Sequence, residues 1–212
     1  MSVARSAHWD AVYREKTADQ TSWFRPHLDE SLRLIDALDM PRELPVLDVG
    51  GGRSTLADDL LARGYTDVGV LDISAVAVAE SKQRLAAQAP SVHWVVGDVV
   101  DLDLPAARVA LWHDRAVFHF LTDADERARY VATARHALRP GGHLVIGTFA
   151  ADGPERCSGL AVTRYDAPAL AAVFAPGFRL VSRSRDVHRT PSGNEQAFTY
   201  VVLQRCGDGV DA

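Results

Sequence analysis

The stretch Leu44-Pro45-Val46-Leu47-Asp48-Val49-Gly50-Gly51-Gly52-Arg53-Ser54-Thr55 decides the fold of this sequence. Its residues 46–49 form a short apolar run rich in β-branched side chains, which predicts a buried strand. The glycines that follow lack a Cβ, so the backbone can turn sharply there and approach a ligand closely. A helix is expected over residues 56–63, capped by Ser54 or Thr55. Strand, glycine turn and helix in this order predict the phosphate or nucleoside cradle of a doubly wound α/β sheet.

The charge at the glycine turn separates two versions of such a cradle. Asp48 stands on the strand immediately before the turn, and Ser54 occupies the third glycine position of the dinucleotide pattern. A carboxylate there repels a pyrophosphate but attracts an ammonium group. The turn therefore favours a ligand with a positively charged amino-acid end.

Four motifs occur along the chain in a fixed order: Asp48-x-Gly50-x-Gly52, Leu71-Asp72-Ile73-Ser74, Gly97-Asp98-Val99, and Leu-Arg-Pro-Gly-Gly-His-Leu at 138–144. With these motifs the sequence resembles the class I S-adenosylmethionine-dependent methyltransferases. The resemblance covers residues 45–150. It implies a Rossmann-like, doubly wound sheet of seven mostly parallel strands, the last one antiparallel, with helices on both faces. It also implies S-adenosyl-L-methionine as the cofactor and S-adenosyl-L-homocysteine as the product.

The totals fit one globular domain. The chain has 212 residues, a net charge of −5 and two cysteines. We expect a single domain over 1–206, with cap helices in 1–40, an active-site loop at 150–166 and a flexible tail at 207–212. The acidic balance argues against a nucleic-acid partner, and the absence of a long apolar run argues against a membrane partner. We expect a cytoplasmic protein, because two cysteines do not suggest a disulfide framework, and either a monomer or a homodimer.

Two carboxylates after neighbouring strands are predicted to hold the nucleoside. Asp72 ends the second strand, where two acceptor oxygens suit the two ribose hydroxyls; the alternative role is to cap the next helix, for which Ser74 is the better candidate. Asp98 can accept a hydrogen bond from the adenine amine while Val99 donates its backbone N–H. The complete predicted cofactor set is Asp48, Gly50, Gly51, Gly52, Asp72, Ile73, Asp98, Val99, His113 and Trp23.

The N-terminal segment contains two amphipathic helical patterns, at 8–13 and from Pro26 onward. We expect Trp9 to be core. In the resembling family the N-terminal helices close over the cofactor, which makes Trp23 and Arg25 candidates for contacting its methionine end or the acceptor.

The strand predicted at 109–112 delivers His113-Asp114-Arg115 to the edge of the sheet where ligands bind. His113 is a candidate base or acceptor-orienting group, with packing as an equal alternative. Asp114 is a weaker candidate base, because it can instead cap a helix at 116–121 and pair with Arg115. The Asp/Asn-Pro-Pro-aromatic run of DNA amino-methyltransferases is missing here, which argues against a base-methylating enzyme.

The segment after the fifth strand supplies the remaining candidates. Cys157 lies in the 150–166 loop and could contact a soft acceptor, although an idle cysteine is the favoured alternative. Arg164 and Tyr165 are weaker candidates for orienting a substrate. His188, between strands expected at 178–185 and 197–204, could reach the acceptor pocket, although a solvated hairpin histidine is more common.

These observations predict a methyltransferase that moves a methyl group to a small acceptor, with a lean toward a thiol or another soft nucleophile because no convincing acid–base pair is present. The first alternative is a protein lysine methyltransferase, because residues 9–23 and the short glycine turn resemble that subgroup. More remote alternatives are a non-catalytic S-adenosylmethionine-binding module and an NAD-dependent oxidoreductase, which Asp48 and Ser54 disfavour. We predict no metal site.

Overall fold

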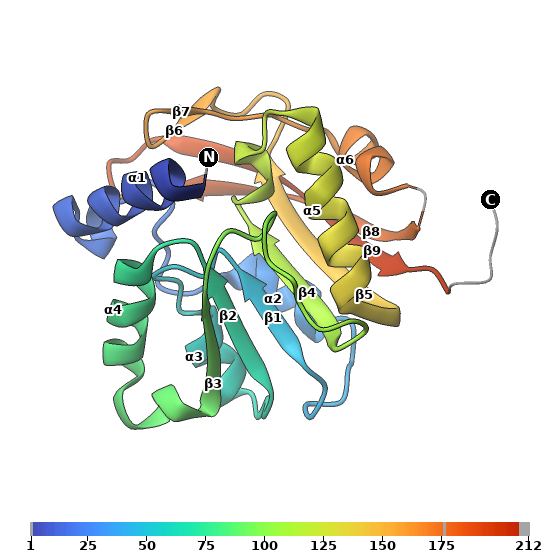
Figure 1. The fold of residues 1–212 in the computed structure, drawn as a ribbon. Helices are drawn as coiled ribbons and strands as arrows, with labels where there is room; N and C mark the ends of the chain where they lie inside the picture. The colour runs from blue at the N-terminus through green and yellow to red at the C-terminus, as the bar shows by residue number, and fades with distance from the viewer. Residues whose placement is uncertain (1, 176, 208–212) are drawn as a thin grey trace.

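The computed structural model describes residues 2–175 and 177–207, and a seven-stranded sheet lies at its centre (Figure 1). The strands of this sheet are β1 (Val46–Val49), β2 (Val68–Asp72), β3 (Val92–Val96), β4 (Val109–Arg115), β5 (Leu138–Phe149), β8 (Phe178–Arg189) and β9 (Glu195–Arg205). Their spatial order is β3-β2-β1-β4-β5-β9-β8. β1 to β5 pair in parallel, whereas β9 is inserted antiparallel between β5 and β8. The predicted sheet with its antiparallel last strand is confirmed.

Helices cover both faces of the sheet (Figure 1). They are α1 (Ser2–Glu15), α2 (Asp29–Asp36), α3 (Leu56–Ala62), α4 (Ala75–Leu85), α5 (Ala124–Ala137) and α6 (Ala167–Phe174), with 3-10 turns η1 (Ala18–Gln20), η2 (Ala86–Ser91) and η3 (Phe118–Phe120). One core contains Ile35 of α2 and Leu60 of α3, and the other contains Tyr130 of α5 and Phe174 of α6. Strand side chains alternate between these two cores, as the period of two requires.

The strand order reverses between β1 and β4, because the chain runs outward through β2 and β3 and then returns to the other side of β1. Ligands of open α/β sheets bind at such a switch point, outside the carboxyl ends of the strands. The glycine turn after β1 and the end of β4 therefore mark the place of the site.

The structure corrects the prediction for the segment after β4. The expected helix at 116–121 is only the 3-10 turn η3, and β4 continues to Arg115 instead of ending at residue 112. Ala116 adopts a φ of 70° at this point. This left-handed conformation turns the chain too sharply for an α-helix to start there.

Several other boundaries also differ. The turn expected at 8–13 belongs to α1, the helix expected from Pro26 begins at Asp29, and the loop 150–166 contains the short hairpin of β6 (Arg156–Cys157) and β7 (Leu160–Ala161). The hairpin strands β8 and β9 are longer than predicted, and β5 contains residues 140–142, where its pairing with β4 has a register shift between Val109 and Leu111. The predicted tail falls mostly outside the described residues. Within the described ranges, no helix has the length and apolar character needed to cross a bilayer.

Candidate active site

A cavity opens at the switch point of the sheet. Its walls are formed by Arg5, Trp9, Tyr13, Trp23, Val49, Gly50, Leu71, Asp72, Ile73, Gly97, Asp98, Val99, Arg115, Ala116, Val117, Phe120, Leu121, Phe149, Cys157 and Phe198. The acids come from the ends of β2 and β3, whereas most of the aromatic rings come from α1, the segment after β4, β5 and β9. We call the acidic part of this wall its polar end and the part built from the rings its aromatic end; Tyr13 adjoins both, because its hydroxyl and Asp72 Oδ2 both lie beside Gly52.

The polar end contains the two predicted nucleoside ligands. Asp72 is buried, and its Oδ1 accepts the backbone N–H of Ser74 at 2.7 Å. Burial raises the pKa of Asp72 to about 7, and the charges of Asp48 and Asp10 act in the same direction. Ser74 is the helix cap, as predicted, because its side chain accepts from the N–H of Ala77. The ribose contact of Asp72 stays a prediction.

Asp98 lies beside Asp72 in the wall of the cavity and is also buried. Its Oδ2 accepts from Arg5 of α1 at 2.8 Å, and Arg5 also bonds Glu126 of α5 at 2.5 Å. Arg5 thus connects helix α1 to the segment after β3 and to helix α5. Arg5 was not predicted as a site residue, because its position in a polar helix does not indicate which distant residues it contacts.

The glycines of the turn are needed for packing within the protein. A Cβ on Gly50, whose φ is +66°, would lie 1.9 Å from Val117 Cγ2. A Cβ on Gly52, whose φ is +49°, would lie 2.5 Å from the Tyr13 hydroxyl oxygen. Any side chain at either position would therefore displace the segment after β4 or helix α1.

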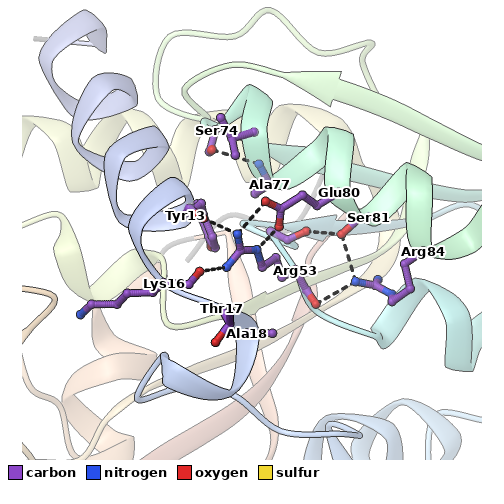
Figure 2. A network of polar contacts seen from close by, with 12 residues as sticks. Tyr13, Lys16, Thr17, Ala18, Arg53, Ser74, Ala77, Glu80, Ser81 and Arg84 are labelled. Atoms are coloured by element: carbon purple, nitrogen blue, oxygen red, sulfur yellow. Dashed lines mark hydrogen bonds and ion pairs between the residues drawn. The ribbon is translucent and has the colours of Figure 1, made fainter.

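Arg53 fastens the end of α1 to the glycine turn, as Figure 2 shows. Its guanidinium donates to the carbonyl oxygens of Tyr13 and Lys16 and pairs with Glu80 of α4. At the other end of the same contact surface, Ser74 Oγ donates to Asp10 at 2.6 Å. These bonds hold Tyr13 over the turn and complete the wall of the cavity.

The aromatic end is built from rings that meet edge to face. The ring of Trp9 lies 5.0 Å from that of Phe120 and 5.9 Å from that of Trp23, centroid to centroid. Trp23 lines the cavity, as expected for a residue near the ligand. Trp9 was expected in the core, but it lies in the cavity wall, because α1 crosses the edge of the sheet instead of covering a face.

Arg115 is a charged residue at this end that was not predicted as a site residue. The expected pair with Asp114 does not form, since the structure shows no ion pair for Arg115 among the described residues. Neighbouring residues of a strand point to opposite faces, which separates the two side chains. That alternation, applied to a β4 that reaches residue 115, places Arg115 on the same face as His113 and at the end of the strand.

His113 is placed by β4 away from this cavity, with both ring nitrogens engaged. Nδ1 lies 2.7 Å from Asp48 Oδ1, and Nε2 lies 2.9 Å from Ser31 Oγ of α2. All three groups are buried. This chain of hydrogen bonds joins β1, β4 and α2, so neither nitrogen is available to serve as a base, and the structure supports the packing alternative.

Asp48 lines a second, smaller cavity beside the glycine turn rather than the main one. The two cavities share Tyr13, Trp23, Gly50 and Arg115. Because His113 already bonds Oδ1 of Asp48, only the other carboxylate oxygen remains for a cationic ligand group. Pairing of Asp48 with an ammonium group stays a prediction.

Asp114 is buried in the opposite core. It accepts from the backbone N–H of Val117 at 2.9 Å and from the hydroxyl of Tyr130 at 2.5 Å. Burial raises the pKa of Asp114 to about 6, against the opposing effect of the Tyr130 hydrogen bond. Asp114 stabilises the turn after β4 from outside the cavity, which is the structural role favoured in the sequence analysis, although it caps a shorter turn than expected.

Cys157 lies on β6 in the wall of the main cavity. Burial raises the pKa of its thiol to about 11. The cysteine is therefore a thiol at neutral pH, which makes it a packing surface and not a nucleophile. Arg164 bonds Gly153 and Glu155, and neither Arg164 nor Tyr165 lines the cavity.

His188 differs from the expected solvated hairpin residue, because it is buried and holds the segment that carries Trp23. Nδ1 accepts from Arg25 Nε at 3.0 Å, so Nε2 donates to the Ser22 carbonyl at 2.8 Å. Burial lowers the pKa of His188 to about 4, and the charge of Arg115 adds to this effect. His188 does not line the cavity, so its predicted catalytic role does not follow from its position.

The wall also contains residues that were not predicted as site residues: Arg5, Trp9, Tyr13, Val49, Leu71, Gly97, Arg115, Ala116, Val117, Phe120, Leu121, Phe149 and Phe198. Some stand at the ends of parallel strands, which is a usable signal. The contribution of α1 depends on long-range contacts that no local pattern reveals.

Comparison with known proteins finds a methyltransferase domain model and structures of the same fold. A family model described as a methyltransferase domain matches residues 46–142. The chain is 28% identical over 149 residues to the eEF1A lysine and N-terminal methyltransferase of Bos taurus and 26% identical to that of Homo sapiens. Each alignment takes in 68% of this chain, but the chain spans only 21% of the length of these curated relatives.

Solved structures show the same fold. A structure described as "Conversion of a Disulfide Bond into a Thioacetal Group during Echinomycin Biosynthesis" has a TM-score of 0.79 at 20% identity, covering 97% of this chain and 94% of that one. The 1,6-didemethyltoxoflavin-N1-methyltransferase of Burkholderia thailandensis, with S-adenosylhomocysteine bound, has a TM-score of 0.69 at 24% identity, covering 97% and 85%. A methyltransferase domain model therefore matches just under half of this chain, and nearly the whole chain has the fold of S-adenosylmethionine-dependent methyltransferases.

Proposed function

We propose that this chain is an S-adenosylmethionine-dependent methyltransferase, and that it methylates a small acceptor held in the aromatic end of the main cavity. The observation that carries the proposal is the division of one cavity into an acidic end and an aromatic end, with Gly50 and Ala116 in the wall as well. Asp72 suits the ribose hydroxyls, and Asp98 with Val99 suits the adenine edge. The sulfonium then lies between the two ends, with the acceptor beyond it.

The chemistry requires positioning more than proton transfer. A lone pair of the acceptor forms a bond to the methyl carbon while the S–CH₃ bonding pair returns to sulfur, so the cationic sulfonium becomes a neutral thioether. Holding the reactants in line can supply roughly 7–11 kcal/mol of the barrier reduction. The rigid aromatic walls and the α1 contacts support this role, because they fix the shape of the acceptor end.

The cavity offers no suitable general base at its aromatic end. Cys157 and Tyr13 line the wall, but burial raises both of their pKa values. The carboxylates of Asp72 and Asp98 lie at the other end. We infer that the acceptor brings its own available lone pair, as a thiolate, another anion or an unprotonated nitrogen does.

The test combines binding with methyl transfer. Calorimetry should detect S-adenosylhomocysteine binding, and methyl-labelled S-adenosylmethionine should label members of a panel of small thiols, phenols, carboxylates and amines. Asp72→Ala should remove cofactor binding, whereas Cys157→Ser should keep it. Binding of the cofactor without transfer to any small molecule or protein would instead support a non-catalytic binding module, and tight binding of NADH alone would support the oxidoreductase alternative.

Protein lysine methylation is the second candidate, because the similarity to the eEF1A lysine and N-terminal methyltransferases favours it. Incubation with purified eEF1A and labelled cofactor tests this directly. Labelling of a lysine in that protein, with no labelling in the small-molecule panel, would replace our proposal.

A further inference from the structure

Arg115 places a positive charge at the aromatic end of the cavity. It is the last residue of β4, and its side chain lies across Phe198 of β9, with the guanidinium carbon 4.5 Å from the ring centroid. Nε donates to the Tyr200 hydroxyl at 3.2 Å, and Nη1 donates to the Trp23 carbonyl at 3.2 Å. These contacts fix the guanidinium in the wall of the cavity.

Part of the hydrogen-bonding capacity of Arg115 is unused. Nη2 is buried and has no hydrogen-bond partner among the described residues. A guanidinium has five N–H donors, so Nη1 also retains one. Buried donors are usually satisfied, and an orphan in a binding cavity calls for a ligand atom.

The charge of Arg115 is also uncompensated within the described residues, where it makes no ion pair. The other cavity arginine, Arg5, is in contrast bonded to both Asp98 and Glu126. Both carboxylates that line the cavity, Asp72 and Asp98, lie at the cofactor end. Arg115 therefore adds a positive charge to the acceptor end, which opposes a protonated amine and attracts an anion.

The neighbouring walls determine the shape of what can bind beside this charge. Trp9, Trp23, Phe120 and Phe149 present flat apolar surfaces around the same space. Such walls suit a planar body, and a fork of N–H donors suits two oxygens of a carboxylate or of a similar oxyanion.

We propose that Arg115 binds an oxyanion of the methyl acceptor, so that the acceptor is a flat, largely apolar small molecule carrying a negative charge. This inference rests on the proposed function, because it assumes that the aromatic end receives the acceptor. It separates the two candidate functions, since a lysine side chain offers no such anion.

The test uses the enzyme loaded with S-adenosylhomocysteine and three probes of equal shape: benzoate, benzamide and benzylamine. By calorimetry, benzoate should bind at least about tenfold more tightly than benzamide, because a charge-assisted bidentate contact is the stronger one. Benzylamine should bind most weakly. Tighter binding of benzylamine than of benzoate, or no binding of benzoate, would overturn the inference.

Two variants assign the effect to Arg115. Arg115→Gln should bring benzoate and benzamide to within about twofold of each other while the affinity for S-adenosylhomocysteine is kept. Arg115→Lys should retain part of the preference, which serves as the informative variant if Arg115→Gln does not fold. Arg129→Gln, an equal change of charge at an exposed position of α5, should leave the preference intact.

One further outcome concerns the cofactor itself. Arg115 also lines the second cavity, so its anion could be the carboxylate of the cofactor. If Arg115→Gln loses S-adenosylhomocysteine but keeps adenosine, which has no carboxylate, the inference about the acceptor is overturned. If the wild-type enzyme does not bind S-adenosylhomocysteine at all, the proposed function fails instead.

Discussion

Acidification should weaken nucleoside binding through Asp72. The carboxyl group is buried at the polar end of the cavity, and burial raises its pKa to about 7 in the ligand-free protein. One of its oxygens already accepts the Ser74 N–H. The ribose hydroxyls need an oxygen of this carboxylate that can still accept a hydrogen bond. If that oxygen of Asp72 carries a proton, it becomes a donor itself and faces the O–H of the ribose.

The size of this effect follows from the linkage between protonation of Asp72 and binding of the nucleoside. Where only ionised Asp72 binds the ribose, the apparent dissociation constant rises about tenfold for each pH unit below 7. Between pH 8 and pH 5 the total change is about 90-fold, or about 2.7 kcal/mol. The direction is fixed because binding releases the proton that the free enzyme holds.

Calorimetry with adenosine at several pH values measures this change. Adenosine isolates the ribose contact, because it lacks the amino-acid end of the cofactor. Asp72→Asn should bind weakly and show a flat profile, whereas Asp114→Asn, which changes a buried acid outside the cavity, should keep the wild-type slope. A wild-type constant that moves less than about threefold, or a slope that survives in Asp72→Asn, would refute the reasoning.

The raised pKa of Asp72 also makes the stability of the ligand-free protein depend on pH. Asp72 keeps its proton up to a pH of about 7 in the folded state but loses it near its ordinary value when unfolded. The folded state therefore binds the additional proton between these values, and the contribution of this group to stability falls as pH rises through that window. Urea unfolding of Asp72→Asn should lack this component.

Three further substitutions test the wall of the cavity. Gly50→Ala should lower the free energy of unfolding, measured by urea titration, by about 2–4 kcal/mol, because strain at its φ adds to a clash with Val117. The control Gly64→Ala, where φ is +85° and the space around the Cβ is open, should lower it by only about 1 kcal/mol. Arg53→Gln should release the end of α1, seen as faster amide hydrogen exchange in that helix and a dissociation constant for S-adenosylhomocysteine about tenfold higher. His113→Ala should cost about 3 kcal/mol of stability because it leaves a buried carboxylate without its partner; unchanged stability with lost turnover would restore a catalytic role for this histidine.

The sequence predicted most of the sheet because its signals are local. The apolar runs at 46–49 and 92–96, the glycine turn and the cap at Ser74 each depend on residues within one short segment. The boundaries after β4 were wrong for a physical reason. Residues 116–121 have helix-compatible side chains, but the left-handed Ala116 and the hydrogen bonds from Asp114 determine the turn.

The site residues follow the same rule: those with a local signal were predicted, and those placed by long-range contacts were not. Asp72 and Asp98 were found because acids that follow neighbouring parallel strands must meet at one edge of the sheet. Arg5 and Tyr13 were not selected, because their ligand-side positions depend on contacts with residues far along the chain, such as the bond from Arg5 to Glu126. His113 was selected by position alone, and only the structure shows that Asp48 and Ser31 occupy both of its nitrogens.

Two buried histidines near the site bear on whether the protein supplies a general base. Burial lowers the pKa of His119 to about 3 and that of His188 to about 4, with the charge of Arg115 adding to both effects. Both rings are therefore neutral through the physiological range and make structural hydrogen bonds. In each ring the nitrogen without a proton already accepts a hydrogen bond, from the Phe149 N–H in His119 and from Arg25 in His188, so neither ring offers a free lone pair to the methyl acceptor. The same arginine that contributes to these shifts also stabilises negative charge on a bound ligand, so the cavity favours an acceptor that has already lost its proton to solvent.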